Sequence, residues 1–478
     1  MEKVIFKRAA LSAAIVAAML APGMVLAAQD MMSPTYGKSY EAFADDAKLT
    51  GGIFYFQRER DRKQAGPGQD GKYHSNLSHS TAQVALNFNS GYAWDVVGLD
   101  LGGYGAYNLA VDESNAANEE NEFSFWGSSW GTSDGLSENG ASLTNAALKF
   151  KFGDSVTAKG GYTQLYVPGV IGVNWSYQPG TYRGGQVEGN FGGLYLTYAI
   201  ADEYKAPWFK ETQIFSRSKS KPWIAGYSPL DEQYKIDYIH GIAARYTFEN
   251  GTAVTGSFGQ SKDYMDSYHF KLAHKFDVLG GLSTSYQFYG SETSDFDATA
   301  GDAGQTYDGL AWQQALTAAW AMGPYGFRLE GLWTKAEGNE GNYLPRLTRG
   351  YGNSQGANEI WWDSRSDWNH NNEKALFAGV TRSLDDIVGA PGWAVGLSGA
   401  YGWDAENGDS TLVDGKEWAV NFDVMYTVQD GKLKGTLFKL HYTDYNNEQD
   451  ELGSWAYPNM FSSEKDVKLH MIMPFTFM

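Results

Sequence analysis

The sequence contains no cysteine. The chain therefore has no disulfides, and it has no cysteine that could carry a lipid anchor. Basic residues are also scarce, because 37 Lys and Arg stand against 56 Asp and Glu and the formal net charge is −19. A body with this charge repels the phosphates of nucleic acids. These absences argue against a disulfide scaffold, a lipoprotein and a nucleic-acid partner.

Long apolar runs are missing too, except at the N-terminus. Basic residues precede an apolar run over residues 9–20, and Val25-Leu26-Ala27 supplies a pattern of small residues before a polar segment. Pro22 interrupts the run before it reaches the roughly 20 apolar residues that a spanning helix needs. The pattern is typical of a secretory signal peptide, which we expect over residues 1–27.

Helical periodicity is scarce in the rest of the chain, whereas alternation of apolar and polar residues recurs almost throughout. In residues 436–443, for example, Phe438, Leu440 and Tyr442 share one face while His441 lies on the other. Strands of about 10 such residues suit a membrane barrel with a wet interior. A soluble sandwich gives the same alternation, so the number of strands and the lengths of the loops decide between the two.

The alternation predicts eighteen strands, an even number as bacterial single-chain barrels require. They start near residues 47, 75, 94, 142, 156, 181, 192, 233, 252, 265, 279, 308, 324, 373, 393, 416, 434 and 464. Short Gly-rich turns, such as residues 153–155, alternate with long polar loops, such as residues 110–141 and 338–372. This rhythm is typical of short periplasmic turns and long outer loops. We therefore predict an all-β fold, a transmembrane antiparallel β-barrel over residues 47–478 with an N-terminal arm over residues 28–46.

Such a barrel lies in the outer membrane of a Gram-negative bacterium, where lipid and lipopolysaccharide surround it. The last strand supports this prediction, because its alternating apolar face ends in the aromatic residues Phe475 and Phe477. Met478 follows the final aromatic residue, which is a departure from the usual ending. The lipid-facing pattern does not fix the number of subunits, so a monomer and a homotrimer both stay open.

Motifs of enzymes and cofactor sites are weak or missing. The letters of Gly352-Asn353-Ser354-Gln355-Gly356 match a nucleophile elbow, but an elbow needs a buried strand before it and a helix after it. This match sits in a loop rich in Gly and Asn. No phosphate-binding or metal-ligand motif is present. We expect no cofactor, no metal and no enzymatic activity, with an outer-membrane enzyme as a remote alternative.

Aromatic residues concentrate in two of the predicted outer loops. The segment over residues 164–186 includes the third outer loop and carries Tyr166, Trp175, Tyr177, Tyr182 and Arg183. Aromatic rings are unusual in an exposed loop, so we expect this loop to fold against the inner wall of the barrel.

The seventh outer loop contains the second cluster, in residues 359–373. Its members are Trp361, Trp362, Asp363, Arg365, Asp367 and Trp368. Flat apolar faces beside polar groups are the combination that grips sugars by stacking and hydrogen bonding. The alternative for any one of these Trp residues is a membrane-interface belt or a packed loop.

The first strand ends in a run of charges, GGIFYFQRERDRK at residues 51–63. An Arg on the lipid face costs roughly 2 to 4 kcal/mol at the middle of the bilayer. We therefore expect Phe54, Phe56, Arg58 and Arg60 to face the lumen, with Glu59 outside at the level of the headgroups.

Several longer stretches resemble the OprD family of outer-membrane porins, and within it the enteric chitoporins. They are LTGGIFYFQRERDRK at 49–63, GYTQLYVPG at 161–169, DEYKAPW at 202–208, TSYQFYG at 284–290, WWDSRSDWN at 361–369 and TVQDGKLKGTLFKLHYTDYN at 427–446. The resemblance implies an eighteen-strand barrel whose third and seventh loops fold inward and constrict the channel. It also implies a ladder of basic residues on the lumen wall. Its rungs are Arg58, Arg60, Lys149, Lys151, Arg245, Arg328 and Lys439.

The substrate class implied by the resemblance is chitooligosaccharides, which would cross by facilitated diffusion. The family also contains channels for amino acids, peptides and small carboxylates, and this alternative stays open. The third loop reads Val-Asn-Trp-Ser-Tyr at residues 173–177, where relatives of the amino-acid type carry a more acidic stretch with Arg. This departure favours a neutral, flat substrate.

Overall fold

The structure is a computed structural model. It describes residues 42–111, 123–126, 137–217, 234–294, 306–338, 340–348, 354–406, 413–449 and 461–477. The signal peptide expected over residues 1–27, and most of the arm expected over residues 28–46, lie outside these ranges. A short helix, α3 (Ala42–Asp45), precedes the first strand. Its Phe43 carbonyl accepts a hydrogen bond of 3.0 Å from the backbone of Gly91, which lies in the connection after the second strand.

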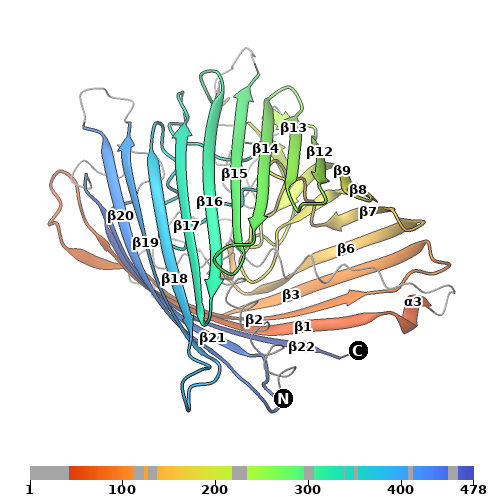
Figure 1. The fold of residues 1–478 in the computed structure, drawn as a ribbon, viewed down its shortest axis with the longest axis horizontal. Helices are drawn as coiled ribbons and strands as arrows, with labels where there is room; N and C mark the ends of the chain where they lie inside the picture. Colours follow the sequence, from red (N-terminus) through yellow and green to blue (C-terminus); the bar gives the residue numbers. More distant parts are fainter. Residues whose placement is uncertain are drawn as a thin grey trace.

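Eighteen long antiparallel strands form one closed barrel (Figure 1). They are β1 (Lys48–Lys63), β2 (Tyr73–Asn89), β3 (Val97–Val111), β6 (Gly140–Phe152), β7 (Val156–Thr163), β8 (Thr181–Phe191), β9 (Leu194–Lys205), β12 (Ile239–Thr247), β13 (Ala253–Ser261), β14 (Met265–Phe276), β15 (Leu282–Thr293), β16 (Ala311–Met322), β17 (Tyr325–Lys335), β18 (Lys374–Ser383), β19 (Trp393–Ala405), β20 (Gly415–Thr427), β21 (Leu437–Asn447) and β22 (Glu464–Thr476). Each pairs with the next, and β1 pairs with β22 to close the ring. The predicted fold class and strand number are confirmed.

The predicted strand starts lie within three residues of the observed ones, with one exception. A strand expected near residue 233 begins instead at Ile239. The cause is a separate two-residue strand, β11 (Lys235–Ile236), which pairs with β10 (Gln213–Ser216). β10 in turn extends the end of β9. A second small pair, β4 (Phe125–Trp126) with β5 (Ser137–Glu138), belongs to the loop between β3 and β6.

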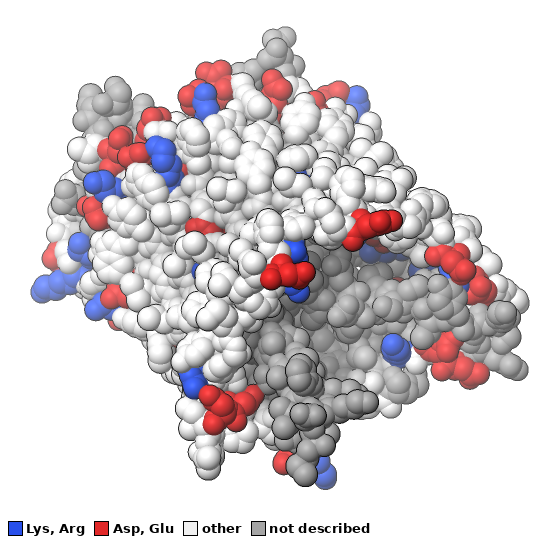
Figure 2. All heavy atoms as spheres, viewed as in Figure 1, with Lys and Arg blue, Asp and Glu red and all other residues white. Residues whose placement is uncertain are grey.

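The wall alternates as a barrel in lipid requires. On β21, Phe438, Leu440 and Tyr442 are exposed, whereas His441 between them is buried. Figure 2 shows one face of the molecule as a broad uncharged surface, with most of the visible charged residues near its edges. No helix among the described residues has the length and apolar character to cross a membrane. The exposed Phe438, Leu440 and Tyr442 belong to the apolar band on the outward faces of the strands, which meets hydrocarbon.

Candidate functional site

The third loop, residues 164–180, connects β7 with β8 and contacts strands on another part of the wall. The Tyr177 hydroxyl donates a hydrogen bond of 2.9 Å to the carbonyl oxygen of Tyr55 on β1. The same hydroxyl lies 2.7 Å from Nδ1 of His470 on β22. Its ring stacks on Phe54, with 5.0 Å between centroids. The loop therefore reaches from β7 and β8 to the seam where the barrel closes.

These rings belong to a small aromatic cluster. Phe123, from the loop between β3 and β6, stacks on Phe56 at 3.8 Å and lies 4.7 Å from Tyr177. Phe56 also meets the ring of His470 at 5.0 Å. Such ring pairs add stability beyond the area they bury. The loop between β3 and β6, the third loop and the strands β1 and β22 therefore pack together in one aromatic cluster.

The third loop also bonds to the seventh loop, residues 336–373. The amide of Gly172 donates to the carbonyl oxygen of Gln355 at 2.8 Å, and the Tyr182 hydroxyl donates to the same oxygen at 3.1 Å. Asn174 donates to the side-chain oxygen of Gln355 at 3.1 Å. Ser354 next to it is buried and bonds to Thr348, so the serine of the elbow-like sequence is a packed loop residue. The two predicted loops are therefore in direct contact.

Two members of the predicted third-loop set differ sharply in position. Tyr182 is fully buried, whereas the Arg183 side chain is 44% exposed. Arg183 pairs with Asp202 at 2.6 Å on the same face as the exposed Val187. That face points away from the lumen, so the prediction that Arg183 lines the constriction is wrong. The cause is its place within β8, where alternate residues take opposite faces. Tyr166 is half-buried, and its amide bonds to Gln186. Trp175 is half-buried too and forms an isolated bridge with Pro179.

The three Trp residues of the seventh loop do not play one role. Trp362 and Trp368 are 3% and 2% exposed, whereas Trp361 is 52% exposed. The Trp362 indole donates to Glu330 at 2.7 Å, and its ring stacks on Phe377 of β18 at 5.2 Å. Two of the rings are therefore packing residues, as the alternative of a packed loop predicts, and do not offer faces to a sugar. Only Trp361 keeps an accessible face.

The charged residues of the seventh loop bind to β21 and β22. Asp363 lies 2.5 Å from Nζ of Lys468 and 3.5 Å from Nε2 of His441. Burial alone raises the pKa of Asp363, but the positive charges of His441, Lys468 and Lys439 outweigh it and hold this pKa well below its usual range. Arg365 donates to Glu464 of β22. Asp367, by contrast, is exposed.

The basic residues predicted as a ladder are paired with carboxylates at six of the seven positions. The pairs are Arg58 with Asp466 at 2.6 Å, Arg60 with Glu464 at 3.9 Å, Lys149 with Asp100 at 2.7 Å, Lys151 with Asp95 at 2.9 Å, Arg328 with Glu330 at 2.6 Å, and Lys439 with Asp423 at 3.0 Å. Arg245 differs, because it is exposed and lies over the ring of Tyr195 at 4.9 Å. Six of the seven predicted cations therefore have a carboxylate as counter-charge.

The carboxylates in these pairs were missed by sequence reasoning. Glu464 and Asp466 lie at the start of β22, in the parity opposite to the apolar Val467 and Leu469. That alternation was a usable signal, because residues between lipid-facing positions face the lumen.

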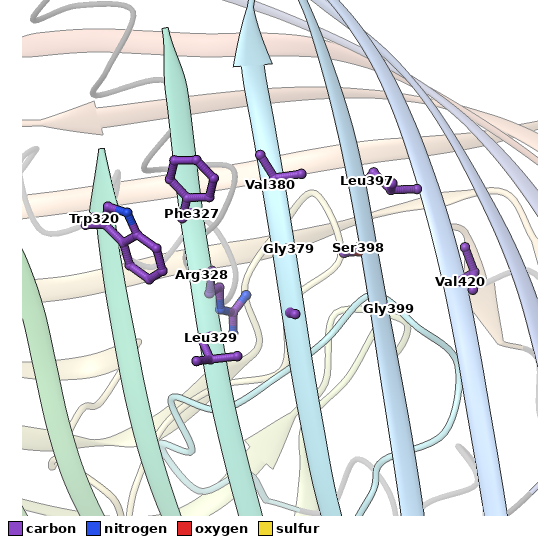
Figure 3. A pocket seen from close by; sticks show the side chains of 11 residues that line it. Trp320, Phe327, Arg328, Leu329, Gly379, Val380, Leu397, Ser398, Gly399 and Val420 are labelled. Carbon is purple, nitrogen blue, oxygen red and sulfur yellow. The ribbon is translucent and has the colours of Figure 1, made fainter. Parts of the chain in front are cut away.

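A hollow of about 460 Å³ crosses β16 to β20, but it is not part of the channel. Its lining is mostly apolar and includes Trp320, Phe327, Leu329 and Leu397 (Figure 3). Leu329 and Leu397 are exposed residues of the outer face. The hollow is therefore a shallow depression in the lipid-facing surface.

Comparisons with known proteins agree with this architecture. The model of a family described as outer membrane porin, OprD family, matches residues 41–455. The chitoporin of Escherichia coli (strain K12) is 42% identical over 456 residues, which cover 91% of this chain and 93% of that protein. Acinetobacter baumannii OccAB1 superposes with a TM-score of 0.71 at 16% identity, covering 92% of this chain and 99% of that one. A BenF-like porin from Pseudomonas fluorescens Pf-5 gives 0.69 at 17% identity, covering 91% and 100%.

Proposed function

This chain belongs to the OprD family of outer-membrane porins, and from this premise we propose that it carries chitooligosaccharides across the outer membrane by facilitated diffusion. Chitooligosaccharides are chains of N-acetylglucosamine and carry no net charge. The gradient of the sugar drives transport, so no catalytic step and no cofactor takes part. The likeness to a chitoporin at 42% identity supports this substrate class.

The observation that carries the proposal is the pairing of charges on the channel wall. An unpaired cation attracts small anions and slows their exit, whereas a cation held 2.6 to 3.0 Å from a carboxylate, as Arg58, Lys149 and Lys439 are, projects a weaker field. A wall of such pairs still offers hydrogen-bond donors and acceptors. The hydroxyl and acetamide groups of the sugar bind to such donors and acceptors, and they need no net charge on the wall.

The third and seventh loops form the narrow part of the channel in this proposal. Their mutual bond between Gly172 and Gln355, and the contacts of Tyr177 with Tyr55 and His470, support such a placement. Trp361 supplies an accessible ring at the seventh loop. One stacking contact contributes on the order of 1 kcal/mol, or roughly fivefold in affinity. Binding of this strength biases entry and still permits exit, as conduction requires.

A channel for amino acids, peptides or small carboxylates is the second candidate function. Arg245 favours it, because this exposed guanidinium has no ion pair with any residue that the structure describes. An exposed cation without an ion pair can bind the carboxylate of such a solute. The paired state of the other six predicted rungs favours the neutral sugar instead.

Solute flux into proteoliposomes separates the two functions. Swelling rates are compared for N-acetylglucosamine trimer, a maltotriose control of similar size, lysine and glutamate. We expect the chitin sugar to enter faster than maltotriose at equal concentration. Faster entry of lysine or glutamate, with no difference between the two sugars, would support the second candidate and overturn the first.

A further inference from the structure

Two buried glutamates of the barrel lack the partner that the other buried carboxylates have. Asp466 and Glu330, for example, pair with Arg58 and Arg328. Glu373, at the end of the seventh loop, and Glu417, on β20, are 1% and 0% exposed. Neither forms an ion pair with any Lys or Arg among the described residues. Burial of two carboxylates costs free energy unless a positively charged group lies beside them.

The third member of the group is His370, which is itself fully buried. Its Nδ1 lies 2.7 Å from Oε2 of Glu373, and its backbone amide donates to the same oxygen at 3.0 Å. One ring nitrogen of His370 and one oxygen of each glutamate all lie within 4.8 Å of one another. Three ligand-type atoms thus surround one small volume between the seventh loop and the wall.

Hydrogen bonds hold Glu417 in place, but no Lys or Arg among the described residues pairs with either glutamate. Ser366 donates to one oxygen of Glu417 at 2.7 Å, and the Tyr445 hydroxyl donates to the other. Oε1 of Glu373 is buried and has no hydrogen-bond partner among the described residues. A buried acceptor without a donor costs about 1 to 3 kcal/mol, so the group is incomplete as it stands.

We propose that His370, Glu373 and Glu417 bind one divalent transition-metal ion of the zinc class, which fastens the end of the seventh loop to β20. Zinc takes imidazole nitrogen together with carboxylate oxygen, and three protein ligands with a further small ligand complete its shell. Calcium and magnesium prefer sets made of oxygen alone. Ser366 and Tyr445 serve as outer partners that hold Glu417 in position, as is common around metal sites.

The test is metal binding by the full-length protein purified in detergent. The protein is stripped with a chelator, dialysed against micromolar zinc and measured for bound metal, and cobalt is titrated while its visible absorption is recorded. We expect one ion per chain. Glu417→Gln, which keeps the shape of the side chain, should weaken binding at least tenfold, because even outer partners account for 10- to 100-fold.

Glu330→Gln is the matched control, since it removes a buried carboxylate that pairs with Arg328 and lies outside the group. It should leave the metal content unchanged. Should Glu417→Gln fail to form a heat-modifiable barrel, His370→Gln provides the second variant, and its loss of an imidazole ligand should change the cobalt spectrum. Absence of stoichiometric metal, or equal binding by the folded variants and the parent, overturns the proposal and leaves a proton shared between the glutamates. Sugar transport does not enter this test, so its outcome is independent of the proposed function.

Discussion

Asp363→Asn removes one carboxylate from the paired network of the channel wall. In the parent protein this carboxylate lies 2.5 Å from Lys468 and 3.9 Å from Lys439. Lys439 keeps Asp423 at 3.0 Å, but Lys468 keeps only Asp466 at 3.7 Å, which Arg58 already occupies. The substitution therefore leaves about one uncompensated positive charge on the lumen wall.

The size of the effect follows from Coulomb's law. A unit charge about 7 Å from a passing ion, in water, changes its energy by about 0.6 kcal/mol. The same charge favours an anion and disfavours a cation, so the permeability of each ion changes roughly threefold and their ratio changes roughly sevenfold. The ion pairs themselves are partly exposed, so the loss of stability should stay within about 1 to 2 kcal/mol.

The assay is the reversal potential of single channels in a planar bilayer under a gradient of potassium chloride. We expect a shift toward anions for Asp363→Asn, which shrinks as ionic strength rises. Asp386→Asn is the matched control, because it also removes a carboxylate paired with a cation, Arg382 at 3.0 Å, but in the exposed turn after β18. An equal shift in both variants, or none in Asp363→Asn, would refute the idea that pairing sets the charge of the wall.

Three further predictions concern the two loops. Trp361→Ala should weaken the block of current by a chitin hexamer about fivefold. Trp362→Ala should leave any block intact, but it should lower the free energy of unfolding in urea by about 3 to 5 kcal/mol, because its ring is buried. Tyr177→Phe deletes the hydroxyl next to His470, which should lower the free energy of unfolding by about 1 kcal/mol and increase the current noise of the open channel. Unchanged noise would count against a role of the third loop in the channel. Nearby cations hold the pKa of Asp363 below its usual range. The ion pairs that attach the seventh loop are therefore fully formed above about pH 4, and they are lost only as the pH falls through the lowered pKa. Current noise that already rises between pH 7 and pH 5 would contradict this.

The strands could be predicted because their signal is local. A residue on β21 faces lipid or lumen according to its parity, so the alternation of Phe438, Leu440 and Tyr442 with His441 identifies the strand without knowledge of its neighbours. The count of eighteen then followed from the turns between strands. The one displaced start, at Ile239, arose where a short extra strand pairs outside the main ladder.

The site was harder to predict, because its contacts join distant parts of the chain. Arg58 meets Asp466 only after the barrel closes, 408 residues further along. Trp361 and Trp362 are neighbours in sequence, yet one is accessible and the other packs on Phe377. That difference depends on how the loop packs against β18. The loop has no regular alternation of apolar and polar residues from which this packing could be predicted.

The group of His370, Glu373 and Glu417 shows the same limit. The first two residues are close in the chain, but the third comes from β20 and joins them only in the folded barrel. No spacing motif marks such a set in advance, and the expectation of no metal rested on motifs alone.

Single-channel current with chitin sugars of rising length tests the proposed transport most directly. The sugars, from dimer to hexamer, are added to one side of a planar bilayer that holds a single channel. A wall of paired charges with an accessible ring at Trp361 predicts brief current blocks. Their duration should rise with chain length, because each added sugar unit makes further weak contacts. Absence of blocks at every length, together with clear blocks by lysine or a small carboxylate, would contradict the account.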